Sequence, residues 1–163
     1  TFIENARIKA VSLKNYLLNK QPSGVAMDET YIVADDSGLE CEDLDGQPGV
    51  QSARFAGEHA TDAENNAKLV SMFAVTTHLT RAAQYVCALV LLFPDGSSKE
   101  IIETCQGFIT LSPQGDGGFG YDPHFYLDRY NKTMAELPLD EKNKISHRGK
   151  AIRKLVRILQ DEV

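Results

Sequence analysis

The apolar positions at the start of the chain repeat with the period of an amphipathic helix. They recur every three or four residues to about position 19, which predicts one buried stripe. The positions are Ile3, Ala6, Ala10, Leu13 and Leu17. Thr1 and Glu4 form a capping box, a start signal for a helix. Lys9 lies off the stripe, so its ammonium group is available to solvent or to a ligand.

Two further regions carry helix signals. A second capping box, Thr61 with Glu64, predicts a helix to about Phe73 that buries Leu69 and Met72 together with that phenylalanine. Near the end of the chain, a short helix is expected over 133–137, followed by a last helix that begins after a serine N-cap. The buried stripe expected for that last helix is Ile152, Leu155, Val156 and Leu159.

Strands are predicted where apolar residues are continuous or β-branched. The run from Tyr31 to Ala34 is short and meets Asp35 and Asp36 and then a Ser-Gly turn, a pattern typical of a buried strand that ends there. Because side chains alternate along a strand, the two carboxylates should point to opposite sides. Residues 85–93 are too apolar for an exposed strand, so we expect a central strand within a long hairpin over 83–110.

The composition is that of one ordinary globular domain over 1–163, with 42% hydrophobic and 25% charged residues. A net charge of −6 argues against nucleic-acid and membrane-surface partners, which require a basic patch. A nucleotide stays possible, because a metal ion can neutralise its phosphates. No membrane span or signal peptide is evident, which favours a cytoplasmic protein. Cys41, Cys87 and Cys105 have no disulfide or zinc-site spacing and are expected to be reduced core thiols.

Three clusters could carry chemistry. Asp35 and Asp36 either bind a cation or are solvated acids at a strand end. The glycine-rich run 114–123 contains a formal Gly-x-Gly-x-x-Gly pattern, but a proline and strand-like residues 124–127 follow where a dinucleotide motif requires a helix. That run is either a ligand loop that presents Phe119 or a tight connection with Phe119 in the core. His147 and Arg148 are either surface residues or donors to an anionic or carbonyl-bearing ligand at a helix N-terminus.

Four runs in this order resemble the inosine triphosphate pyrophosphatase family. They are ADDSGLECEDLDGQPGVQSARFAG (34–57), GGFGYDPHF (117–125), KTMAELP (132–138) and EKNKISHRGKA (141–151). The resemblance implies Mg²⁺-dependent hydrolysis of non-standard purine triphosphates (ITP, dITP and XTP) to the monophosphate and pyrophosphate. It also implies an α/β fold with a long mixed, twisted sheet flanked by helices, two lobes with the nucleotide in a central cleft, and a homodimer.

The same resemblance implies roles for individual residues. Asp35 and Asp36 would bind Mg²⁺, and Asp36 would also act as general base or position the attacking water. Lys9 would contact the triphosphate, and Ser37 would complete the turn beneath the metal. Phe119 would stack on the purine. The remaining base-pocket residues would be Tyr121, Asp122, Lys142, Ser146, His147 and Arg148.

Two alternatives remain open at this point. The family's N-terminal strand and Ser/Thr-Gly-Asn-x-x-Lys phosphate loop, with a further acidic metal ligand, are not among these 163 residues. If they are naturally absent, a nucleotide-binding protein without catalysis is the alternative. A Maf-like nucleotide pyrophosphatase is the nearest other enzyme, although the Ser-His-Arg and Gly-Phe-Gly-Tyr-Asp-Pro runs are not expected in it.

Overall fold

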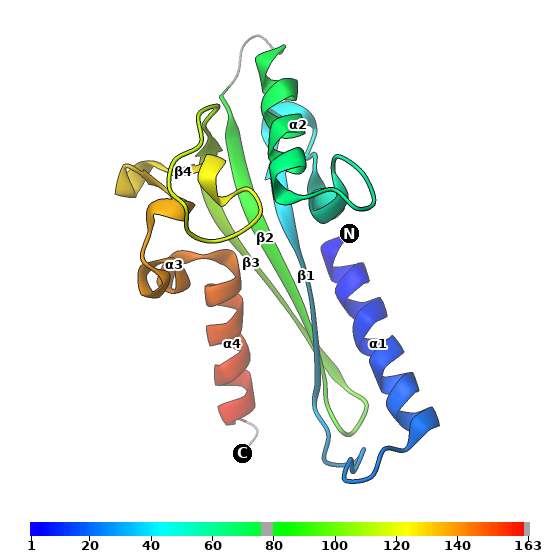
Figure 1. Ribbon diagram of the computed structural model, residues 1–163. Helices are drawn as coiled ribbons and strands as arrows, with labels where there is room; N and C mark the ends of the chain where they lie inside the picture. The colour runs from blue at the N-terminus through cyan, green and yellow to red at the C-terminus, as the bar shows by residue number, and fades with distance from the viewer. Residues whose placement is uncertain (76–79, 162–163) are drawn as a thin grey trace.

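The structure is a computed structural model, and it describes residues 1–75 and 80–161 (Figure 1). The helices and strands are α1 (Phe2–Lys20), β1 (Ile32–Cys41), α2 (Asp62–Ala74), β2 (Ala82–Leu92), β3 (Ser98–Ile109), β4 (Phe125–Leu127), β5 (Lys132–Thr133), α3 (Leu139–Ile145) and α4 (His147–Asp161). Short 3₁₀ helices are η1 (Glu42–Leu44), η2 (Gly49–Arg54), η3 (Asp122–His124), η4 (Asp128–Tyr130) and η5 (Met134–Glu136).

The sheet has five strands in the order β1-β2-β3-β4-β5, and each is antiparallel to its neighbours. The long hairpin is confirmed: β2 and β3 pair from Ala82 opposite Phe108 to Leu92 opposite Ser98. The prediction of a mixed sheet is wrong for the described residues, whose strand pairs are all antiparallel. The chain leaves β1 and enters β2 at the same end of the sheet, with Cys41 opposite Ala83, so the two strands must run in opposite directions.

Strand β1 does not end at the two acids, as the sequence had suggested. It continues through Asp35 and Asp36 to Cys41, and Gly38 lies inside it. A Cβ atom on Gly38 would lie 2.5 Å from both the Gly49 carbonyl oxygen and the Ser52 hydroxyl. The glycine is therefore required for close packing of η2 against the strand, and not for a turn.

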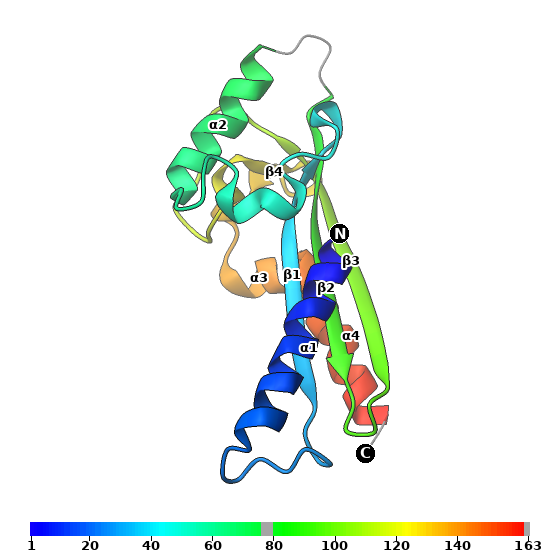
Figure 2. The same cartoon turned by 90° about the vertical axis from the view of Figure 1, so that its right-hand side faces the viewer.

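Helices α1 and α4 cover opposite faces of the β1–β3 sheet, on either side of it in Figure 1 and in front of and behind it in Figure 2. Ala10 of α1 shares a buried cluster with Val90, whereas Leu155 of α4 shares one with the adjacent strand residue Leu89. Neighbouring residues of β2 thus enter different cores, because strand side chains alternate. The capping boxes that start α1 and α2 are confirmed.

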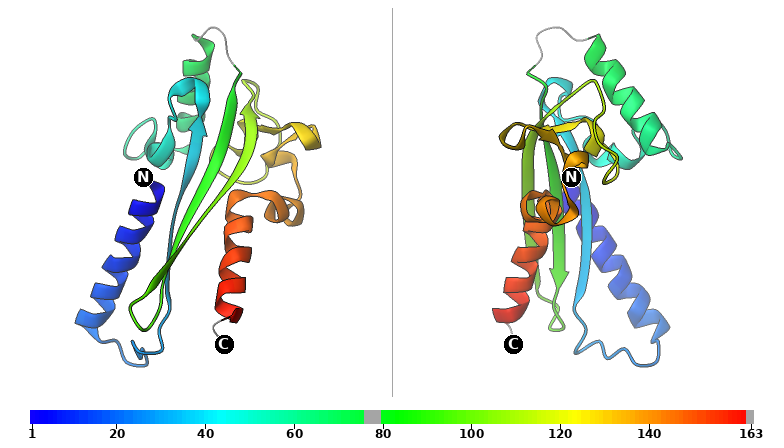
Figure 3. Two further views of the ribbon diagram at one scale, coloured as in Figure 1. Left: turned by 180° about the vertical axis from the view of Figure 1, so that it is seen from behind. Right: turned by 60° about the vertical axis from the view of Figure 1, so that its left-hand side comes forward.

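A separate core fills the other end of the sheet, where α2, β4, β5 and the short 3₁₀ helices gather (Figure 3). Phe73 of α2, Tyr85 of β2 and Phe125 of β4 belong to it. The cores against α1 and α4 thus lie toward one end of the sheet and this third core toward the other, which agrees with the expected two lobes. The three cysteines are buried and unpaired, as expected of core thiols.

One helix prediction was wrong in part. In α4, Leu155 is buried as predicted, but Ile152 and Val156 are 44% and 46% exposed, and Ala151 is buried. The short helix expected over 133–137 is present as η5, which ends before Pro138, whereas α3 after that proline was not anticipated. In the described part of the chain, no helix is both long and apolar enough to cross a membrane.

Candidate active site on two faces of strand β1

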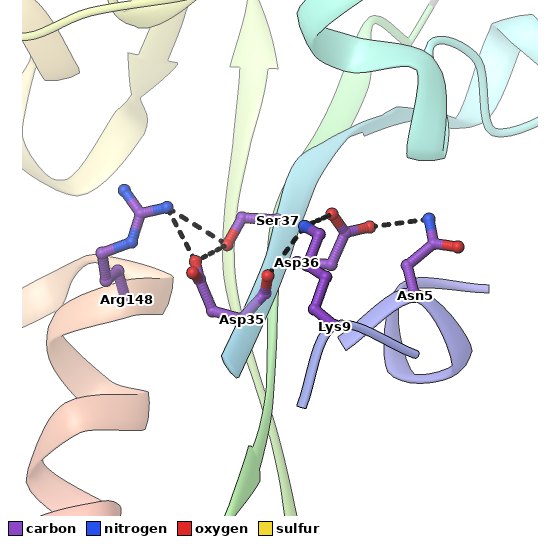
Figure 4. Close-up of polar contacts among 6 residues, drawn as sticks. All are labelled: Asn5, Lys9, Asp35, Asp36, Ser37 and Arg148. Atoms are coloured by element: carbon purple, nitrogen blue, oxygen red, sulfur yellow. Dashed lines mark hydrogen bonds and ion pairs between the residues drawn. The ribbon is translucent and has the colours of Figure 1, made fainter. Parts of the chain in front are cut away.

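Asp36 points toward helix α1, where two side chains hold its carboxylate (Figure 4). Lys9 Nζ lies 2.6 Å from Asp36 Oδ1, and Asn5 Nδ2 donates to Asp36 Oδ2 at 3.0 Å. Lys9 also donates to the Asp35 carbonyl oxygen at 2.9 Å. Residues four apart on a helix share a face, so one turn of α1 supplies both donors. The Asp36 side chain is 15% exposed and that of Lys9 is 54% exposed.

Asp35 points toward helix α4, on the opposite face of the same strand (Figure 4). Arg148 Nη2 lies 3.1 Å from Asp35 Oδ2 and donates to Ser37 Oγ at 3.4 Å. The Ser37 hydroxyl donates to Asp35 Oδ2 at 3.3 Å, which closes a triangle of three side chains. The expectation that the two acids point to opposite sides is therefore met. The two carboxylates therefore have different partners, Asn5 and Lys9 for Asp36 and Arg148 and Ser37 for Asp35.

Phe119 presents an exposed aromatic ring beside two cationic side chains. The ring is 58% exposed, so the alternative of a core phenylalanine is wrong. Lys142 Nζ lies 4.6 Å and the Arg148 guanidinium carbon 5.6 Å from the ring centroid. An accessible aromatic face with flanking donors is suited to stacking on a planar heterocycle and to hydrogen bonding along its edge.

Asp122 stabilises the loop that presents Phe119 (residues 114–123, called the aromatic loop below). Its carboxylate is buried and pairs with Lys142, while it accepts from the Phe119 amide at 2.9 Å and from the Tyr85 hydroxyl at 3.2 Å. A Cβ atom on Gly118 would lie 2.0 Å from Asp122 Oδ2, so only glycine leaves room for that carboxylate. Buried charge is tolerated here because a cation and two neutral donors satisfy it.

His147 is buried against the face of Tyr85, with ring centroids 4.7 Å apart and planes 16° from parallel. Burial, followed by the charges of Arg148 and Lys142, lowers the pKa of His147 to about 4, although Asp35 acts in the opposite direction. The imidazole is therefore neutral at neutral pH and can donate from only one nitrogen. Its Nδ1 atom is buried and has no hydrogen-bond partner in the described part of the protein.

Two expected base-pocket residues serve the fold in this structure. Ser146 is buried, and its hydroxyl accepts from the Gly149 amide at 3.1 Å, as an N-cap of α4 does. Tyr121 is buried in the core that contains Phe73 and Phe125, and it donates to the Ser52 carbonyl oxygen at 2.8 Å. Burial raises the pKa of the Tyr121 hydroxyl, so that it stays protonated. Whether either residue touches a ligand stays a prediction.

Several residues that organise the site were not identified from the sequence. Asn5 could have been found, because it lies one helical turn before Lys9. Tyr85 sits in an apolar run that gave no sign of its polar contact with Asp122. Asp62 and Asn66 of α2 bind the Gly120 backbone at 2.6 and 2.8 Å and anchor the aromatic loop, a contact that no local pattern announces.

A cavity of about 860 Å³ lies across β1, β2 and β3, lined there by Glu40, Gln84 and Gln106, and not at these residues. Its lining also includes Phe108, Lys144 and Lys150. The candidate site is a different surface, which includes both faces of β1 and the aromatic loop. Strand β1 pairs with β2 along one edge, and η2 packs against it near Gly38.

Paired acids and cations next to an exposed aromatic ring, on an antiparallel sheet between helices, define a nucleotide-binding α/β protein with hydrolase-like chemistry. Residues 1–158 match the model of the Ham1 family, and the chain belongs to this family. Among curated relatives it resembles the dITP/XTP pyrophosphatase of Bacillus anthracis, with 47% identity over 157 residues, 95% of this chain and 72% of the relative. The protein of the same name from Desulforamulus reducens is 48% identical over 98% of this chain and 74% of its own length.

Solved structures agree with this assignment. The Staphylococcus aureus Ham1 protein superposes with a TM-score of 0.87 at 40% sequence identity, covering 100% of this chain and 78% of the other. The dITP/XTP pyrophosphatase of Mycobacterium abscessus gives a TM-score of 0.73 at 37% identity, covering 98% and 76%. The resemblance identified from the sequence motifs is therefore confirmed at the level of the family.

Proposed function

We propose that this protein hydrolyses non-standard purine nucleoside triphosphates, namely dITP, ITP and XTP, to the monophosphate and pyrophosphate. The names of the curated relatives support this activity. The observation that carries the proposal is one placement of groups along β1. The exposed Phe119 ring lies beside Lys142 and Arg148, and Arg148 contacts Asp35 on one face of β1. On the other face of the strand, Asp36 contacts the ammonium group of Lys9.

The base is proposed to stack on Phe119 and to meet hydrogen-bond donors along its edge. Hypoxanthine and xanthine carry a carbonyl acceptor at the position where adenine carries an amino donor. Arg148 is a donor that cannot be deprotonated, so it suits the carbonyl and opposes the amino group. Sites built around such hydrogen bonds can discriminate by roughly 10⁴-fold or more.

The metal proposed for this reaction is Mg²⁺, and Asp36 is the residue that would hold it. A carboxylate oxygen is a ligand that Mg²⁺ prefers, and one or two carboxylates with substrate phosphates are a common ligand set. Within the described residues no three acidic, histidine or cysteine side chains are grouped for a metal, so the phosphates must supply further ligands. When bound, the ion neutralises charge on the phosphoryl oxygens.

The chain's own residues then divide the remaining work. Asp36 orients a water molecule or accepts its proton as the water attacks the phosphorus next to the ribose. Lys9 is half-exposed at Asp36, from where its ammonium group can turn to the phosphates. Its charge offsets the charge of the pyrophosphate leaving group, which is the main requirement of phosphoryl transfer.

A panel of ITP, dITP, XTP, GTP and ATP with Mg²⁺ tests this function, with pyrophosphate and phosphate release scored separately. We expect pyrophosphate from the first three and little product from GTP or ATP. Phosphate as the main product would exclude the proposed bond cleavage. Tight binding of dIMP without turnover of any triphosphate would indicate a binding protein that lacks catalysis.

The oligomeric state and the cellular compartment stay predictions. A homodimer in the cytoplasm is proposed, on the strength of the family resemblance. Light scattering coupled to gel filtration measures the mass in solution, and a mass of about 18 kDa, that of one chain, would contradict the dimer.

A further inference from the structure

We infer that Asp35 is a positioning residue that orients Arg148 for base recognition, and that it does not share a metal ion with Asp36. The inference rests on the proposed function of this site. It assigns the two adjacent acids to different parts of the substrate. Asp36 acts on the phosphate side through α1, and Asp35 acts on the base side through α4.

The first support is the closed triangle of Asp35, Ser37 and Arg148 (Figure 4). Asp35 Oδ2 receives both the guanidinium, at 3.1 Å, and the Ser37 hydroxyl, at 3.3 Å. Ser37 Oγ also accepts from Arg148 at 3.4 Å. Two alternate residues of β1 therefore fix the end of a side chain from α4.

The second support is what this contact leaves available. Both hydrogen bonds of Arg148 within the described residues use Nη2. Its other guanidinium donors remain for a ligand beside the Phe119 ring, 5.6 Å from the guanidinium carbon. Arginine is long and loses much rotamer freedom when fixed, so an anchoring carboxylate reduces the ordering that ligand binding would otherwise require.

The third support is exposure. The side chains of Asp35 and Arg148 are 45% and 43% exposed, and ion pairs this exposed contribute little to folding. Stability therefore gives no strong reason for the pair, whereas orientation of a recognition residue does.

The fourth support is the separation of the two acids. Asp36 turns to Asn5 and Lys9 on α1, and Lys9 reaches the Asp35 backbone carbonyl and not its carboxylate. The Asp35 carboxylate is already neutralised by a guanidinium. To bind the ion held by Asp36, it would have to leave Arg148 and turn to the other face of the strand.

The central experiment compares Asp35→Asn with the wild-type protein. The amide keeps the size of the side chain and removes its charge. We expect KM for dITP to rise about tenfold and the dITP/dATP ratio of kcat/KM to fall by a similar factor, since a charge-assisted hydrogen bond is lost. Mn²⁺ affinity, measured by electron paramagnetic resonance with a non-hydrolysable dITP analogue, should stay within about twofold for Asp35→Asn and fall by tenfold or more for Asp36→Asn.

Glu103→Gln is the matched control. Glu103 of β3 pairs with Lys154 of α4, so this variant also removes a strand-to-α4 ion pair, but one in which Arg148 takes no part. We expect unchanged discrimination and turnover. Ser37→Ala, which removes the third member of the triangle, should give a smaller loss of the same kind as Asp35→Asn.

A double variant tests whether Asp35 acts through Arg148. If it does, Asp35→Asn adds no further loss of discrimination to Arg148→Ala, because the residue that it orients is gone. Additive losses would overturn the inference. So would an Asp35→Asn protein that keeps its discrimination and loses Mn²⁺ affinity.

Calorimetric binding of dIMP and dAMP separates this inference from the proposed function. If the wild-type protein hydrolyses no triphosphate, the proposed function fails, yet the ratio of the two dissociation constants still reports on Asp35. A dIMP/dAMP ratio that Asp35→Asn leaves unchanged would refute the positioning role even in a fully active enzyme.

Discussion

The two faces of β1 differ in how tightly they hold an acid of the same type. On the α1 face, Asp36 is mostly buried and receives donors from two residues of one helical turn. On the α4 face, Asp35 is half-exposed and receives a flexible arginine and a neighbouring serine. A firmly held acid suits chemistry at phosphorus, where position determines rate. A more exposed acid that orients an arginine suits recognition of a base.

The largest effect on turnover is expected from a change on the α1 face of β1. Asp36→Asn should lower kcat by roughly 10³-fold, since it removes the general base and the metal ligand together. The dissociation constant of dIMP should change little, because the base is bound on the other face. Single-turnover kinetics and calorimetry measure the two quantities.

Glu100→Gln is the control for that variant, since Glu100 pairs with Arg7 of α1 on the same face of the sheet. It should leave kcat unchanged. An Asp36→Asn protein with full turnover and weakened dIMP binding would reverse the assignment of the two faces.

A smaller loss is expected when only one donor to Asp36 is removed. Asn5→Ala should lower kcat about tenfold, the value of one hydrogen bond to a charged group, with little change in dIMP affinity. Steady-state kinetics with dITP checks this. Asn15→Ala, an exposed position on the same helix, should have no effect. Loss of base discrimination in Asn5→Ala would show that the two faces are not separate.

Tyr85→Phe tests the contribution of the Tyr85 hydroxyl to base binding. This change removes the hydroxyl that donates to Asp122 and keeps the ring that packs on His147. We expect dIMP to bind about fivefold more weakly, the cost of one lost neutral hydrogen bond. Inhibition by pyrophosphate should not change.

The matched control is Tyr126→Phe, which removes a hydroxyl contact with Asn131 and leaves the bond between Tyr85 and Asp122 in place. Equal losses of dIMP and pyrophosphate affinity in Tyr85→Phe would point to general disturbance of the core and not to the base pocket.

Acidification should have the smallest effect on turnover and tests the buried imidazole. The pKa of His147 is about 4 in the folded protein against 6.5 as the ordinary value, so below 6.5 the unfolded chain binds a proton that the folded protein does not. Stability is therefore lost as pH falls from 6.5 toward 4, and at about pH 5.5 this group contributes a loss of about 1.4 kcal/mol.

Urea unfolding at about pH 7 and about pH 5.5 measures this loss. In His147→Gln the difference between the two conditions should be smaller by about 1 kcal/mol. The absolute stability of the variant is not the readout, because its packing against Tyr85 also changes. An identical pH dependence in both proteins would contradict the lowered pKa.

Local signals in the sequence predicted the starts of α1 and α2 and the β2–β3 hairpin. Capping boxes and turn residues act within a few positions, so a single sequence contains all that they require. Gly38 misled the prediction of β1, because its reason for being glycine is the carbonyl of Gly49 and the hydroxyl of Ser52, which only the folded chain brings near. Likewise, the packing of α4 on the sheet decides that Ala151 is buried and Ile152 is not.

The members of the site were predicted better than their arrangement. The strand alternation correctly placed Asp35 and Asp36 on opposite sides. The basic helix start drew attention to Arg148, whose role in binding stays a prediction. That Arg148 pairs with Asp35, 113 positions away in the chain, could not be foreseen from spacing. The same holds for Tyr85, whose hydroxyl becomes important only because Asp122 is folded beneath the aromatic loop.

The spacing of Asn5 and Lys9 makes the geometry at Asp36 sensitive to helix length. An α-helix advances by 100° per residue, so inserting a single alanine between these positions would rotate one donor by about that angle relative to the other. No side-chain rotamer could restore both contacts at once. The contacts to Asp36 therefore constrain the number of residues between Asn5 and Lys9 as much as they constrain the residue types at these two positions.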